Sequence, residues 1–151
     1  IGADRAVQKR FGCRIWMGHI EADFFEENPQ EASASEFFGF DNNLQFPIAR
    51  RLEHEELLDF GGVELQVLLT PGHTPGSICL YNEEEKILIS GDTVFAQGFG
   101  RYDLVGGDRE QLKRSLKELS KLEIKELYPG HGPSARGFRI SDNLRSALTF
   151  L

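Results

Sequence analysis

Three short turns rich in glycine and proline constrain this sequence most, because each directly follows an apolar segment of strand length. The turns occupy residues 70–77, 90–95 and 128–133. Short apolar segments bounded by such turn residues are typical of strands buried in a sheet. Helical patterns alternate with these strands, so the sequence predicts a layered α/β protein. Functional sites in such folds commonly gather at strand ends, which draws attention to the side chains in the three turns.

Each turn presents one side chain that is able to bind a metal ion: His73, Asp92 or His131. Imidazole and carboxylate groups are suitable ligands for zinc and iron. Taken singly, a loop histidine is more often a surface or hydrogen-bonded residue, and an aspartate after glycine is usually a turn residue. The occurrence of all three in the same setting favours a metal site.

The hydrophobic pattern also predicts the surrounding helices and strands. We expect helices at 3–11, at 21–27, after Asp108 and from Ser141, and strands at 13–17, 63–69, 78–81, 86–90 and 124–128. Asp108, with Gln111 three residues later, predicts the N-cap of the leucine-rich helix. The least regular stretch is 28–47, whose phenylalanines we expect to anchor it to the core; a pocket wall or a subunit contact is the alternative.

Composition narrows the classes of function. With 151 residues, 40% of them hydrophobic and 27% charged, the chain predicts one soluble globular domain. Its net charge of -7 argues against nucleic-acid binding, which needs a basic face. The longest apolar runs are too short to span a membrane, and no secretory signal opens the chain. We therefore expect no nucleic-acid or membrane partner, with a homo-oligomer left open.

The remaining cysteines and histidines fit structural roles. Cys13 and Cys79 each lie in an apolar stretch, so we expect both to be buried reduced thiols. Reduced thiols indicate a cytoplasmic protein. His19 and His54 lack the glycine-framed setting of the other two histidines. We expect both to be ordinary residues, with His54 on a solvated face.

The three turns together resemble the metallo-β-lactamase superfamily. Their sequences are Pro-Gly-His-Thr-Pro-Gly, Gly-Asp-Thr and Pro-Gly-His-Gly, and the resemblance runs from residue 1 to about 133. It implies the C-terminal two-thirds of an αββα sandwich. It also implies that His73 binds one metal ion, that His131 binds a second, and that Asp92 bridges the two.

The superfamily's His-x-His-x-Asp-His element, which supplies further ligands to both metals, does not occur in these residues. The chain opens on Ile1 and a helix, which resemble the segment directly after that element in the superfamily. We therefore expect residues 1–151 to be a single, N-terminally incomplete domain. In the intact protein the resemblance implies two divalent ions, with zinc first and iron or manganese as alternatives. We expect this chain alone to hold them weakly.

The residues after Asp92 resemble the hydroxyacylglutathione hydrolase (glyoxalase II-like) group, in the runs 92–95, 98–101 and 106–108. This implies a small-molecule substrate, a thioester such as an acyl-glutathione-like conjugate. It also implies hydrolysis by a hydroxide that bridges the metals, with Asp92 orienting it. The alternatives are an iron-dependent persulfide dioxygenase and a catalytically inert fragment or binding module. For Arg101 we expect either a substrate contact or an ion pair with Asp103 or Asp108.

Overall fold

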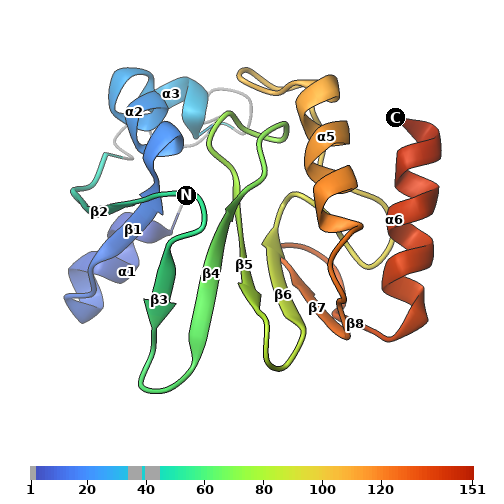
Figure 1. Ribbon diagram of the computed structural model, residues 1–151. Helices are drawn as coiled ribbons and strands as arrows, with labels where there is room; N and C mark the ends of the chain where they lie inside the picture. The colour runs from blue at the N-terminus through green and yellow to red at the C-terminus, as the bar shows by residue number, and fades with distance from the viewer. Residues whose placement is uncertain (1–2, 34–38, 40–44) are drawn as a thin grey trace.

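The computed structural model describes residues 3–33, 39 and 45–151. Within these residues, two sheets and five helices form a layered α/β structure (Figure 1). The helices are α1 (Asp4–Phe11), α2 (His19–Glu27), α3 (Pro29–Ala32), α5 (Arg109–Leu119) and α6 (Phe138–Phe150). The strands are β1 (Ile15–Gly18), β2 (Ile48–Leu52), β3 (Leu57–Asp59), β4 (Glu64–Leu69), β5 (Ile78–Asn82), β6 (Ile87–Gly91), β7 (Glu126–Pro129) and β8 (Ala135–Arg136). The described part of the chain confirms the predicted α/β class.

The larger sheet has the strand order β3-β4-β5-β6-β7-β8. Neighbouring strands are antiparallel except β6 and β7, which run parallel because the crossover helix α5 connects them. Two successive antiparallel pairings make β4 parallel to β6, and therefore to β7 as well. The C-terminal ends of β4, β6 and β7 consequently lie at the same end of the sheet.

Each face of the larger sheet is covered by a different layer. On one face, Cys79, Leu88 and Leu127 pack with α5 and α6 in the main hydrophobic core. On the other face, Val67 packs with Leu52 of the small parallel sheet formed by β1 and β2. The C-terminal ends of β4, β6 and β7 lie between α2 and α3 on one side and α5 on the other (Figure 1).

The helix α5 forms where its sequence predicts. Its stripe of Leu112, Leu116 and Leu119 is at most 1% exposed and packs on the sheet. The Asp108 carboxylate accepts a hydrogen bond of 2.8 Å from the backbone N–H of Gln111, which confirms the predicted N-cap.

Several expectations from the sequence were wrong in detail. Helix α6 begins at Phe138, because Gly137 with a φ of 70° turns the chain into it; the Ser141 hydroxyl instead donates to the Phe138 carbonyl. Cys13 is exposed, because it lies in the connection between α1 and β1 rather than within a strand. Cys79 is fully buried, as expected.

The stretch 28–47 is only partly described. Its first residues form the short helix α3, which the sequence did not predict, with a proline in the first helical position. Phe46 is 7% exposed and its ring centroid lies 4.8 Å from that of Phe25, which confirms core anchoring for this phenylalanine. Phe37, Phe38 and Phe40 lie outside the described residues. Among the described helices, none is long and apolar enough to cross a membrane.

Candidate metal centre

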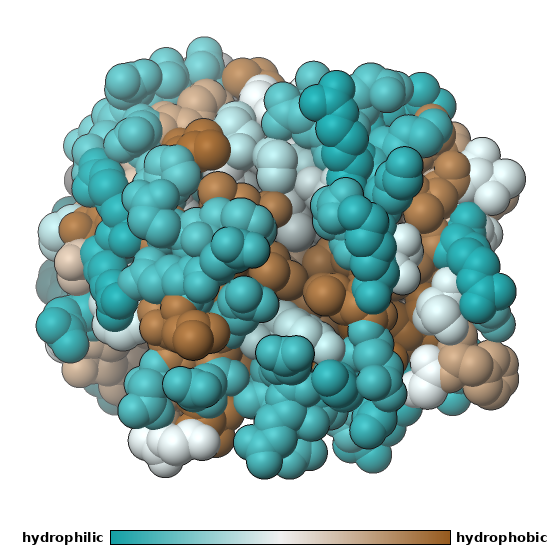
Figure 2. All heavy atoms as spheres, viewed as in Figure 1, coloured by the Kyte–Doolittle hydropathy of each residue, from teal (hydrophilic) through white to brown (hydrophobic). Residues whose placement is uncertain are grey.

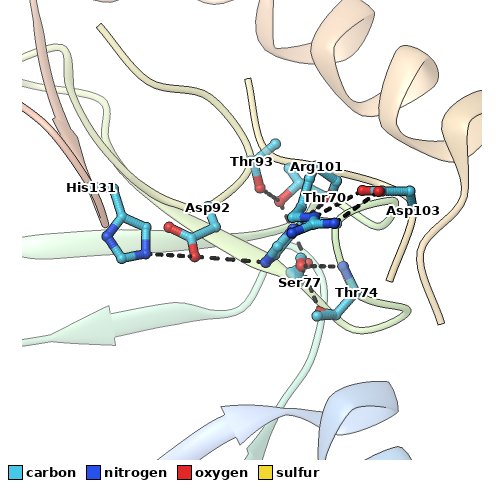
Figure 3. Close-up of polar contacts among 9 residues, drawn as sticks. Thr70, Thr74, Ser77, Asp92, Thr93, Arg101, Asp103 and His131 are labelled. Atoms are coloured by element: carbon cyan, nitrogen blue, oxygen red, sulfur yellow. Dashed lines mark hydrogen bonds and ion pairs between the residues drawn. The ribbon is translucent and has the colours of Figure 1, made fainter. Parts of the chain in front are cut away.

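The fold brings the three predicted metal-binding residues together at one end of the sheet. His73 follows β4, Asp92 follows β6 and His131 follows β7. Because these strands are mutually parallel, their C-terminal turns lie side by side. The Asp92 carboxylate faces His131, as Figure 3 shows, and it also lies within 3.6 Å of the His73 ring.

A single carboxylate oxygen faces both rings. Asp92 Oδ2 lies 3.6 Å from His73 Nε2 and 3.4 Å from His131 Nε2. The exposed fractions of the side chains are 19% for His73, 29% for Asp92 and 76% for His131. In the described residues, no three His, Cys, Asp or Glu side chains are grouped so as to hold one metal ion. Asp92 thus pairs with each histidine separately, and these two pairs are called the half-sites below.

The orientation of His73 is fixed by the backbone. Its Nδ1 lies 2.7 Å from the carbonyl oxygen of Arg101, and a carbonyl only accepts hydrogen bonds. Nδ1 therefore carries a proton, and in the neutral ring the lone pair of Nε2 is directed toward Asp92. A histidine that donates one ring N–H to a carbonyl and presents the other nitrogen is the usual arrangement of a metal ligand. The donor set thus fits divalent metal ions.

The turns after β6 and β7 are joined by their backbones. The N–H of Gly130 donates to the carbonyl of Gly91 over 2.7 Å. A Cβ atom at position 130 would overlap the Oδ1 atom of Asp92. Glycine at position 130 is therefore what allows the third turn to approach the carboxylate.

Arg101 makes a two-pronged ion pair with Asp103. Its Nε and Nη2 atoms each lie 2.8 Å from a different oxygen of that carboxylate. The hydrogen bonds from Arg101 hold the pKa of Asp103 below its ordinary value, and those to Asp103 raise the pKa of Arg101. This confirms the ion pair expected with Asp103, whereas Asp108 caps α5 instead. The substrate contact of Arg101 stays a prediction.

A cleft of about 1000 Å³ opens in front of the three residues. Its lining is mostly apolar and includes Trp16, Met17, Ile78, Phe95, Phe99 and Leu104. The hydroxyls of Thr74 and Ser77, which lie 2.7 Å apart, add polar groups beside His73. Apolar brown patches reach the surface between polar areas in the middle of Figure 2. Such a cleft, apolar with a few convergent polar groups, is typical of a small-molecule site.

Sequence reasoning missed buried polar residues that support the turns. Glu21 of α2 is 8% exposed and accepts a hydrogen bond of 3.0 Å from the backbone N–H of Gly76. Thr70 and Thr93 are buried beneath the turns. A carboxylate in a helix and a threonine at a strand end carry no distinctive sequence signal. His54, predicted to be ordinary, is exposed and accepts a hydrogen bond at Nδ1 from the backbone N–H of Leu69.

Comparison with known proteins decides the family. The model of the metallo-β-lactamase superfamily matches residues 1–131. The chain belongs to this superfamily. It is 39% identical over 134 residues to a probable metallo-hydrolase of Methanocaldococcus jannaschii, covering 86% of the chain and 63% of that protein. It is 35% identical over 119 residues to hydroxyacylglutathione hydrolase GloC of Haemophilus influenzae, covering 78% of the chain and 55% of that protein.

Solved structures of superfamily proteins share the fold. The BLEG-1 B3 metallo-β-lactamase superposes with a TM-score of 0.83 at 32% identity, over 97% of this chain and 71% of that one. The protein TTHA1623 in a di-iron-bound form superposes with a TM-score of 0.79 at 29% identity, over 100% of this chain and 71% of that one. The chain thus spans less than two-thirds of the length of the two curated relatives above. It spans 71% of the length of each of these two solved structures.

Proposed function

We propose that the whole protein is a metal-dependent hydrolase that cleaves thioesters, with an acyl-glutathione-like conjugate as substrate. The main support for metal dependence is that the Nε2 atoms of His73 and His131 both face Oδ2 of Asp92. The thioester is supported by the likeness to a hydroxyacylglutathione hydrolase and by the residues that follow Asp92. The superfamily membership of the chain supports hydrolysis as the reaction class.

The chain's own residues hold the ligand atoms in place. The carbonyl of Arg101 holds the His73 ring in the orientation in which Nε2 can bind a metal ion. Asp92 offers one oxygen to both half-sites, and His131 completes the second from a more exposed position. When bound there, two divalent ions would supply a water nucleophile that is ionised near neutral pH and would stabilise negative charge on the scissile carbonyl. We propose zinc as the ion, with iron or manganese as alternatives.

A covalent nucleophile is not needed for this reaction. Cys79 is fully buried, and burial raises the pKa of its thiol to about 11, so it stays protonated and unreactive at neutral pH.

The apolar wall of the cleft fits an acyl chain, while Thr74 and Ser77 offer hydroxyls to the polar part of the substrate. We also propose that further ligands come from parts of the protein beyond these residues, that its partner is a small molecule, and that it works in the cytoplasm.

The test is release of free thiol from an acyl-glutathione thioester by the purified whole protein. We expect turnover that a chelator abolishes and zinc restores, and that Asp92→Asn removes. Turnover that survives the chelator would overturn the metal mechanism. Hydrolysis of a β-lactam but not of the thioester would reject the thioester substrate.

The two alternatives have their own signatures in the same preparation. Oxygen consumption with a persulfide, together with one iron per chain, would identify the dioxygenase. Absence of every turnover with metal supplied would favour an inert binding module. Assay of residues 1–151 alone, with and without zinc, shows separately whether this chain carries activity.

A further inference from the structure

Two buried threonine hydroxyls join the turn that carries His73 to the turn that carries Asp92. The Oγ1 atoms of Thr70 and Thr93 lie 2.9 Å apart, and the residues are 2% and 1% exposed. Thr70 stands three positions before His73, and Thr93 directly follows Asp92. Figure 3 shows Thr70 and Thr93 close to Asp92.

The strand order explains why the hydroxyl pair matters for the spacing of His73 and Asp92 and less for that of Asp92 and His131. Asp92 and His131 follow adjacent strands, β6 and β7, and the backbone bond from Gly130 to Gly91 sets their turns together. His73 follows β4, which β5 separates from β6, so β4 and β6 share no ladder of backbone hydrogen bonds. The hydroxyl pair crosses this gap over the end of β5, where Cys79 Sγ lies 3.4 Å from Thr70 Oγ1.

The hydroxyl pair lies in a buried cluster of polar groups that hydrogen-bond to one another. The Thr70 hydroxyl lies 3.5 Å from the carbonyl of Ser77, which only accepts, and the Cys79 thiol donates to the carbonyl of Ser90 over 3.6 Å. Between Thr70 and Thr93, one hydroxyl donates and the other accepts. The backbone N–H of Thr70 also donates to the Ser77 carbonyl over 2.8 Å, which closes the turn that holds His73. The contact of His73 with the Arg101 carbonyl, which lies beyond the second turn, is nearer the solvent.

We propose that Thr70 and Thr93 are positioning residues that set the separation of His73 and Asp92, and through it the affinity for the metal ion that these two side chains hold. The statement about metal affinity rests on the proposed function, whereas the statement about separation does not. Polar groups that hydrogen-bond a metal ligand commonly control metal affinity. Thr70 and Thr93 would act on the ligands through the turns that carry them.

The test replaces the Thr93 hydroxyl by a methyl group of the same size. Thr93→Val in the whole protein should lower the affinity for Zn²⁺, measured by competition with a chromogenic chelator, by ~10- to 100-fold. Thr93→Ser, which keeps the hydroxyl, should stay close to the wild type. Cys79→Ala is the matched control, because it disturbs the same buried cluster but leaves the hydroxyl pair intact. Wild-type affinity in Thr93→Val, or an equal loss in Cys79→Ala, would overturn the proposal.

A second readout does not depend on metal binding. In crystals of the metal-free proteins, the distance from His73 Nε2 to Asp92 Oδ2, 3.6 Å here, should change in Thr93→Val and not in Thr93→Ser or Cys79→Ala. An unchanged distance in Thr93→Val would overturn the proposal. A wild-type protein that binds no zinc would reject the proposed function, while this comparison of distances would still decide the role of the threonines.

Discussion

The Nδ1 atom of His73 donates a hydrogen bond of 2.7 Å to the carbonyl oxygen of Arg101, and this bond decides which ring nitrogen faces Asp92. The acceptor belongs to the backbone, whereas the Arg101 side chain is engaged with Asp103. Arg101, which the sequence marks as a candidate substrate contact, thus acts on His73 through its main chain. The side chain and the carbonyl of Arg101 are separable by mutation.

Replacing the Arg101 side chain should therefore spare the metal centre. We expect Arg101→Ala to bind zinc with nearly wild-type affinity in chelator competition, because the carbonyl that orients His73 remains. If the guanidinium also contacts substrate, KM rises while metal affinity holds. A tenfold loss of zinc affinity would show that the side chain, and not the carbonyl, orients the ligand.

Gly130 offers a steric test of the Asp92 position. In Gly130→Ala the added methyl group overlaps Asp92 Oδ1, so the carboxylate must move and zinc affinity should fall by at least tenfold. The matched control is Gly132→Ala, where a Cβ meets nothing within 4 Å. Gly132 has a φ of 79°, so this control carries backbone strain without moving Asp92. Equal zinc affinities in the two variants would contradict the proposed role of Asp92.

The two cysteines should differ sharply in reactivity. Cys13 is exposed and should react with a thiol reagent in the folded protein at pH 8, whereas Cys79 should react only after unfolding. Mass spectrometry of the labelled peptides distinguishes them. Rapid labelling of Cys79 in the folded protein would show that its strand opens readily.

The buried thiol also makes a prediction about pH. Burial raises the pKa of Cys79 from 9.0 to about 11, so the folded state keeps a proton that the unfolded state releases above pH 9. The thiol's contribution to the free energy of unfolding is therefore complete below pH 9 and decreases as pH rises toward 11, by roughly 3 kcal/mol in all. Urea unfolding of the wild type and Cys79→Ala over this range should show a shallower pH slope in the variant. Parallel slopes would refute the prediction.

The cap of α5 allows a test of stability away from the ligands. Asp108→Ala removes the acceptor for the N–H of Gln111 and should lower the free energy of unfolding by about 1 kcal/mol. Asp108→Asn keeps an acceptor and should recover most of the loss. Chemical denaturation measures both, and an alanine variant as stable as the wild type would contradict the capping role.

Local signals in the sequence were enough to predict most strands, the α5 cap and the turns that carry His73, Asp92 and His131. The regular alternation in β4 and the leucine stripe of α5 are such signals. Strand β2 was not predicted, because its consecutive arginines at 50 and 51 hide the alternation and its pairing with β1 is made across more than thirty residues. The turns of the site are also held by contacts between residues far apart in the sequence, such as the hydrogen bond from Gly76 to Glu21, which the sequence did not predict. Such pairings appear only once the layers are assembled.

The location of the bound metal is the most direct test of His73, Asp92 and His131 as ligands. Crystals of the whole protein grown with zinc should show two peaks of anomalous scattering at the zinc edge, one on each side of the Asp92 carboxylate. One peak should lie about 2.0–2.1 Å from His73 Nε2 and the other at the same distance from His131 Nε2. Zinc bound elsewhere, or no peak beside Asp92 in a protein that hydrolyses its substrate, would contradict the assignment of these three residues as ligands.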